Sequence, residues 1–134
     1  MTLDLPPMTP SAGCRVLVLE DELLIAMFLD DLLAEAGYTV VGPASSIAEA
    51  LALLASEPLP DIALLDFHVA GETSLAVADA LAGRGVPMVF LTGYGREALP
   101  PRYRDSPVLT KPYEARELIA ALTETLQLPP ATVA

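Results

Sequence analysis

The clearest structural signal in this sequence is Val16-Leu17-Val18-Leu19, followed directly by Glu20-Asp21-Glu22. An unbroken aliphatic run that is rich in β-branched side chains is typical of a short strand buried on both faces. Strands of this kind occur in parallel sheets that have helices on both sides. The stretch therefore indicates an α/β protein in which a group of acids follows the first strand.

The rest of the chain alternates similar apolar runs with amphipathic segments, and glycine or proline separates most of them. The spacing of apolar residues in the first amphipathic segment predicts a helix that buries Ile25, Phe28, Leu29, Leu32 and Ala36. The predicted elements are the strands Val16–Leu19, Tyr38–Val41, Ile62–Leu65, Met88–Leu91 and Val108–Leu109 and the helices Leu23–Ala36, Ser46–Ser56, Thr73–Ala82 and Glu114–Leu126.

These elements predict a doubly wound, five-stranded parallel sheet. Right-handed crossovers leave few arrangements of five strands, and the flavodoxin-like order 2-1-3-4-5, which is a known order for such sheets rather than one that the residues dictate, is the leading candidate. The segment before the last strand contains Gly93, Gly95 and Pro100-Pro101, which leaves only Arg96–Leu99 for a fourth helix. Glycine and proline both disfavour helix, so we expect this helix to be short or irregular. In such a sheet the functional site lies at the carboxyl ends of the strands, between the first and the third.

Length and composition set limits on the kind of protein. A chain of 134 residues with 53% hydrophobic residues holds one folded domain, which we place at residues 14–127 between flexible tails at 1–13 and 128–134. The longest apolar run, Leu23–Leu29, is far shorter than the roughly 20 residues of a membrane-spanning helix. The start of the chain does not resemble a secretion signal, and a single cysteine, Cys14, fits a reducing, cytoplasmic location.

The charge balance is strongly acidic, with a formal net charge of −11. Binding to nucleic acid or to anionic membranes needs clustered basic residues, and the arginines of this chain are scattered. We therefore expect neither partner.

Chemically active side chains follow four of the predicted strands. Glu20 and Asp21 follow the first strand, Asp66 the third, Thr92 the fourth and the single lysine, Lys111, the fifth. Because neighbouring strands lie about 4.8 Å apart, the carboxylates should meet and require a cation. Oxygen ligands suit a hard divalent ion such as Mg²⁺, or Mn²⁺. A carboxylate nucleophile beside a metal and an ammonium group is suited to phosphoryl transfer.

Together, Val16–Asp21, Asp66, Thr92 and Lys111-Pro112 resemble the receiver domain of two-component response regulators, over roughly residues 15–126. The resemblance implies that Asp66 accepts a phosphoryl group. It implies that Asp21 and Asp66 ligate the metal directly, that Glu20 acts through a metal-bound water and that His68 contributes its backbone carbonyl. Lys111 would pair with the acceptor or its phosphate, Thr92 would contact the phosphoryl group, and the bond before Pro112 would be cis.

The segment Pro87–Gly95 is similar to the motif of a receiver subgroup called FAT GUY, from which Met88 and Leu91 depart. Many receivers carry a switch aromatic three residues before the lysine, where this chain has Val108. We hypothesise that Tyr94 takes over the packing role of that aromatic. Subgroup members often consist of a single domain, and we expect a stand-alone receiver here, since the chain ends soon after its last predicted helix.

The leading hypothesis is a phosphorylation-switched signalling module, monomeric or weakly dimeric, rather than a metabolic enzyme. A sensor histidine kinase or a phosphotransfer protein would phosphorylate it, and an unknown downstream protein would respond. We expect the phosphodonor to contact apolar surface on the first helix, at Leu24, Ile25 and Ala26.

Three alternatives remain. The first is an interaction domain that is independent of phosphorylation, which sequence alone leaves open. The second is an aspartyl-phosphate phosphatase of the haloacid dehalogenase type, which needs a second Asp where this chain has His68. The third is a flavodoxin-like cofactor binder, whose phosphate Glu20-Asp21-Glu22 would repel.

Overall fold

The computed structural model describes residues 13–127, so the predicted tails, apart from Gly13, lie outside the described residues. The chain alternates strands with helices and adds one short hairpin and two 3₁₀ turns. The elements are β1 (Arg15–Leu19), α1 (Leu23–Glu35), β2 (Thr39–Ala44), α2 (Ile47–Ser56), β3 (Ile62–Asp66), β4 (His68–Val69), β5 (Glu72–Thr73), α3 (Leu75–Ala82), β6 (Met88–Thr92), η1 (Arg96–Ala98), η2 (Pro101–Tyr103), β7 (Val108–Thr110) and α4 (Ala115–Gln127).

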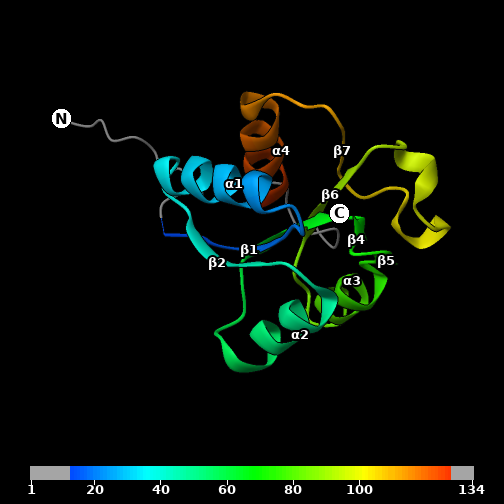
Figure 1. Ribbon diagram of the computed structural model, residues 1–134, viewed down its shortest axis with the longest axis horizontal. Coiled ribbons are helices and arrows are strands. Elements are labelled where there is room, and N and C mark those ends of the chain that lie inside the picture. Colours follow the sequence, from blue (N-terminus) through cyan, green and yellow to red (C-terminus); the bar gives the residue numbers. More distant parts are fainter. Residues whose placement is uncertain (1–12, 128–134) are drawn as a thin grey trace.

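The main sheet has five parallel strands in the order β2-β1-β3-β6-β7, which confirms the predicted doubly wound topology. Helices α1 and α4 cover one face of the sheet, and α2 and α3 cover the other (Figure 1). Strand β1 serves both layers, because Val16 and Val18 pack with the first pair of helices and Leu17 and Leu19 with the second. This double burial is the reason that β1 has no polar residue after Arg15.

Helix α1 buries most of the predicted stripe, because Leu29 is fully buried and Ile25, Leu32 and Ala36 pack against the core, but Phe28 is not part of it. Ala26, Leu29 and Leu33 face the core, whereas Phe28 is 50% exposed. The first two turns of α1 are apolar at every position up to Leu29, so the periodicity could not show that Ala26 rather than Phe28 is buried. The contact with the sheet decides it.

Two element boundaries differ from the prediction by more than one residue. Helix α3 begins at Leu75 rather than Thr73, because Glu72–Thr73 pairs antiparallel with His68–Val69. The two-residue turn between these strands has positive φ at both Ala70 and Gly71, as a tight hairpin requires. Strand β2 continues to Ala44, three residues beyond its predicted end, through a cis Gly42–Pro43 bond.

Helix α2 begins at a capping arrangement formed by Ser46 and Glu49, one residue after its predicted start. The Ser46 hydroxyl accepts a hydrogen bond from the Glu49 backbone N–H at 3.1 Å. The Glu49 carboxylate accepts from the backbone N–H of Ser45, at 2.9 Å, rather than from that of Ser46. This network fixes the connection between β2 and α2.

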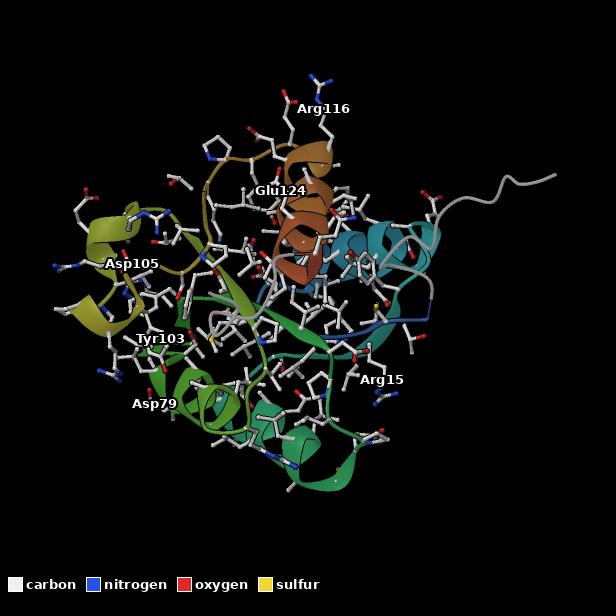
Figure 2. The ribbon with its side chains drawn as sticks, turned by 180° about the vertical axis from the view of Figure 1, so that it is seen from behind. Arg15, Asp79, Tyr103, Asp105, Arg116 and Glu124 are labelled. Carbon is white, nitrogen blue, oxygen red and sulfur yellow. The ribbon has the colours of Figure 1, made fainter. Side chains whose placement is uncertain are left out.

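The fourth helix of the predicted fold is reduced to the turns η1 and η2, as the glycines and prolines of this segment indicate. Hydrogen bonds from side chains, rather than the backbone hydrogen bonds of a helix, hold this segment in position. The Arg96 guanidinium donates to the backbone carbonyls of Arg104 and Ser106, and the Tyr103 hydroxyl donates to Asp79 of α3 at 2.6 Å (Figure 2). The hydrogen bond from Tyr103, with that from Arg102, lowers the pKa of the Asp79 carboxyl.

Replacing Gly42 by alanine is expected to lower the free energy of unfolding by about 3 kcal/mol. Gly42 has a φ of +100°, and an added Cβ would lie 2.6 Å from the backbone N of Ala44 and 3.2 Å from the carbonyl O of Val18. The backbone atoms of two core strands are closely packed, so moving them aside would cost considerable free energy. Urea unfolding measures the loss. Gly71→Ala is the control, since Gly71 also has positive φ but open space around it, and should lose only about 1 kcal/mol; equal losses would contradict the steric explanation.

Candidate metal and phosphoacceptor site

Three carboxylates meet at the carboxyl edge of the sheet. In the register of β1 and β3, Leu19 lies opposite Leu65, so Glu20 and Asp66 continue side by side. One oxygen of each of Glu20, Asp21 and Asp66 lies within 4.8 Å of the others. Glu20 and Asp66 are buried, whereas Asp21 is exposed and leaves the cluster open to solvent on one side.

Backbone amides hold two of these carboxylates. Asp21 Oδ2 accepts a hydrogen bond from the Ala70 N–H at 2.8 Å, and Glu20 Oε2 accepts from the Glu22 N–H at 3.1 Å. The Ala70 contact was not predicted from the sequence, because it depends on the β4–β5 hairpin. The only sequence signal for it is the Ala70-Gly71 pair, which allows a tight turn.

Lys111 supplies the positive charge of the site. Its Nζ lies 2.7 Å from Asp66 Oδ1, and its backbone N–H donates to the Thr92 carbonyl at 2.8 Å. The Lys111–Pro112 peptide bond, which comes directly after β7, is cis. The structure thus brings together Glu20, Asp21, Asp66, Thr92 and Lys111, the five residues that follow the predicted strands.

Excess negative charge remains despite Lys111. Burial raises the pKa of Glu20 to about 7; the nearby Asp66 adds to this, while the Glu22 N–H and Lys111 oppose it. Burial, and then the charge of Asp21, raise the pKa of Asp66 against the pull of Lys111. Burial by itself lowers the pKa of Lys111, but its bond to Asp66 and the surrounding carboxylates raise it overall. The site therefore favours a bound cation over three free carboxylates.

The donor set fits a hard divalent ion. Glu20 Oε1 is buried and receives no hydrogen bond within the described part of the chain, so a metal-bound water or a cation would satisfy it. The three candidate ligands offer only carboxylate oxygen, which suits Mg²⁺ or Mn²⁺ better than zinc. The residues present therefore fit the divalent metal that the sequence predicts.

Thr92 and Tyr94 lie on the far side of Asp66 from β1. Thr92 is buried, and its Oγ1 accepts a hydrogen bond from the Tyr94 N–H at 3.0 Å. The Tyr94 ring is 76% exposed and stands edge-on to the exposed His68 ring, with centroids 5.7 Å apart. The proposed packing role of Tyr94 in place of an aromatic at Val108 stays a hypothesis.

Tyr103 is a buried aromatic that the sequence analysis missed. Its ring packs against Phe90, with centroids 5.4 Å apart, and Phe90 pairs with Val108 in the sheet. Tyr103 therefore packs beside the strand position that lacks the usual switch aromatic. A tyrosine after two prolines in a short loop is the one sequence signal for it, and that pattern is weak.

The contact surface expected on the first helix is partly wrong. Leu24 is 79% exposed, as that prediction requires, but Ala26 is only 7% exposed and Ile25 is half-buried. Ala26 belongs to the core-facing stripe of α1 and so exposes little surface to another protein.

Within residues 13–127, every helix is too short or too polar to cross a membrane.

Comparison with known proteins identifies the family. Residues 16–123 match the family model of the response regulator receiver domain. The transcriptional regulatory protein PdtaR of Mycobacterium tuberculosis is 36% identical over 112 residues, which cover 81% of this chain and 54% of PdtaR. The chain thus spans about half the length of the curated relatives it matches.

Solved structures agree with this assignment. The solution structure of SdrG from Sphingomonas melonis Fr1 is 39% identical, with a TM-score of 0.73 over 88% of this chain and 98% of that one. The BeF₃-activated conformation of SdrG from Pseudomonas melonis Fr1 is 42% identical, with a TM-score of 0.68 over 84% and 98% of the two chains. The family match, these structures and the acidic site at the strand ends lead to one conclusion: this chain belongs to the receiver-domain family of response regulators.

Proposed function

We propose that this chain is a Mg²⁺-dependent phosphoacceptor in which Asp66 receives a phosphoryl group from a sensor histidine kinase or a phosphotransfer protein. The observation that carries the proposal is the position of Asp66, whose Oδ1 lies 2.7 Å from Lys111 Nζ within a cluster of three carboxylates. The phosphorylated form would bind a downstream protein that the unphosphorylated form binds differently. The chain would act as a switch rather than as a metabolic enzyme.

Each residue of the site has a role in this transfer. An oxygen of Asp66 attacks phosphorus, a new O–P bond forms and the P–N bond to the donor histidine breaks. Asp21 and Asp66 would hold the metal directly, Glu20 would do so through water, and His68 would contribute its backbone carbonyl. When bound, the metal neutralises charge on the phosphoryl oxygens.

Lys111 and Thr92 would then recognise the product. The Lys111 ammonium is already at the acceptor and can exchange its carboxylate partner for a phosphoryl oxygen. The Thr92 hydroxyl accepts from the Tyr94 N–H, which leaves its own proton available for a phosphoryl oxygen. A movement of the Thr92 side chain would also move the Gly93–Gly95 segment, because the hydrogen bond from the Tyr94 N–H to Thr92 Oγ1 joins the two.

The SdrG relative supports this proposal, since a protein 42% identical to this chain has a BeF₃-activated conformation. The phosphatase alternative is disfavoured by His68, which stands where that mechanism needs a carboxylate and whose exposed ring instead contacts Phe67 and Tyr94.

Incubation with acetyl phosphate and Mg²⁺ tests the proposal. We expect intact-protein mass spectrometry to show one added phosphoryl group that is stable in acid, is lost in base and is not formed when EDTA removes the metal. A chain that stays unmodified with acetyl phosphate and with purified phosphorylated kinases would be a phosphorylation-independent interaction domain, and the proposal would be rejected.

A further inference from the structure

A groove of about 790 Å³ lies at the amino edge of the main sheet, at the opposite end of the strands from the acidic site. The residues that directly precede four of the strands line it: Cys14 before β1, Asp61 before β3, Pro87 before β6 and Pro107 before β7. The phosphoacceptor and its metal ligands lie at the carboxyl edge, so the proposed phosphoryl transfer does not use this groove. We call it the amino-edge groove.

The wall of the amino-edge groove is largely apolar. The turn between α3 and β6 contributes Val86 and Pro87, β6 contributes Met88, and η2 contributes Tyr103. Pro107 completes the wall beside β7. Grooves that carry aromatic side chains are typical binding sites for extended segments that contain proline. The wall therefore suits an apolar, proline-containing segment.

Among the described residues, two charged side chains line the amino-edge groove, and both already have partners. Asp61 Oδ2 accepts a hydrogen bond from the Arg15 N–H at 2.8 Å, and Arg102 Nη2 lies 3.0 Å from Asp79 Oδ2. A charged group that entered the groove would lose its water without gaining a free countercharge from these residues. The groove therefore favours an uncharged occupant.

The chain itself supplies such a segment directly after α4. Thr125 and Leu126, in the last turn of that helix, line the groove, and the helix ends at Gln127. The sequence that follows is Leu128-Pro129-Pro130-Ala131-Thr132-Val133-Ala134, which has no charged side chain although the whole chain carries a net charge of −11. The two prolines fix φ, which reduces the entropy lost on binding. Because Leu128 is two residues from the groove wall, loop closure costs little.

We propose that the amino-edge groove binds residues 128–131 of this chain. The Leu128 side chain enters the groove beside Met88, and the two prolines that follow lie along the Tyr103 ring. The segment joins the end of α4 to η2 and to the start of β6, and another molecule has to displace it before it can bind there. For these residues the assignment replaces the flexible tail that composition alone predicts.

The segment before β1 is the competing occupant within the chain. It also contains a leucine followed by two prolines, Leu5-Pro6-Pro7. Residues 8–13 separate this motif from Cys14 at the groove wall, so closing that loop costs more entropy than placing Leu128 in the groove. Asp4, next to the motif, would also bring a charge towards an apolar wall.

NMR spectroscopy of the full chain tests the proposal. We expect nuclear Overhauser effects between the methyl groups of Leu128 and Met88. Leu128→Asp should abolish them and should lower the protection of the amides of residues 125–127 from hydrogen exchange by about tenfold, the scale of losing one partly buried leucine. Leu5→Asp is the matched control, because it changes the other leucine that precedes a proline pair, and it should leave both measurements unchanged.

A substitution in the groove wall tests the same contact from the other side. Ala82 is exposed at the end of α3 and lines the groove, so Ala82→Glu places a charge in it and should abolish the Overhauser effects between Leu128 and Met88. Ala52→Glu is its control, because Ala52 is an exposed alanine on α2, outside the groove, and should preserve them.

Three results would overturn the proposal. Wild-type protein without contacts between Leu128 and Met88 would show that the groove does not hold residues 128–131. Loss of amide protection in Leu5→Asp but not in Leu128→Asp would assign the groove to the segment before β1. Contacts that appear only as the protein concentration rises would assign it to a second copy of the chain.

Discussion

Replacing Asp66 by asparagine is expected to abolish phosphorylation by acetyl phosphate and by phosphorylated kinases. The amide is a far weaker nucleophile than the carboxylate, and no other carboxylate of the site is paired with Lys111 in the same way. Glu20 is buried like Asp66, but among the described residues the ion pair of Lys111 is with Asp66, so Glu20 is not expected to accept the group in its place. Intact mass after incubation with the phosphodonor and Mg²⁺ should stay that of the unmodified protein.

Asp105→Asn is the control for this substitution, because Asp105 is exposed on the β6–β7 connection and outside the acidic cluster (Figure 2). The control should be phosphorylated like the wild type. Circular dichroism should show that the Asp66→Asn variant is folded, since the side-chain volume is unchanged. A phosphoryl group that still appears on the folded Asp66→Asn protein would show that another residue is the acceptor.

Replacing Asp21 by asparagine is expected to slow phosphorylation by about a hundredfold, the scale of losing one well-placed stabilising group. Asparagine keeps a side-chain oxygen for the Ala70 N–H but removes one of the three charges that gather within 4.8 Å. Divalent ions should therefore bind weakly. In the wild type, Mg²⁺ at about 100 times its Kd should add about 2.7 kcal/mol to the free energy of unfolding, and the variant should lose most of this gain.

The same substitution should have the opposite effect on the metal-free protein. Like charges repel, so removing the Asp21 charge should raise the free energy of unfolding in EDTA by about 1 kcal/mol. Urea unfolding with and without Mg²⁺ measures both effects. Asp31→Asn is the matched control on α1, since Asp31 is exposed and outside the cluster. Equal stabilisation of the Asp21→Asn variant and the wild type by Mg²⁺ would place the metal elsewhere.

Much of the candidate site could be predicted because it depends on strand ends. A parallel sheet brings the carboxyl ends of its strands to one edge, so the residues after Val16–Leu19 and Ile62–Leu65 had to lie near each other once the strand order was known. The continuous apolar character of these strands indicated burial on both faces, which the structure confirms. Local chemistry also predicted the loss of the fourth helix, because glycine and proline disfavour helix in any context.

Contacts between distant segments could not be predicted in this way. Asp79 and Tyr103 belong to α3 and η2, and their hydrogen bond exists only because those elements pack together. The Ala70 N–H reaches Asp21 only after β4 and β5 have formed a hairpin with positive φ at a non-glycine residue. Neither pairing leaves a periodic pattern in the sequence.

The sequence by itself determined the fold class and the acidic residues that follow its strands, because these depend on hydrophobic patterning and on the geometry of parallel strands, whereas the strand order was taken from the resemblance to receiver domains. Only the tertiary structure decided which positions in the first turns of α1 face the core. The helix is apolar on all sides in its first turns, so contact with the sheet selects Ala26 and Leu29 for burial and leaves Leu24 and Phe28 exposed. That selection leaves an exposed apolar surface on α1.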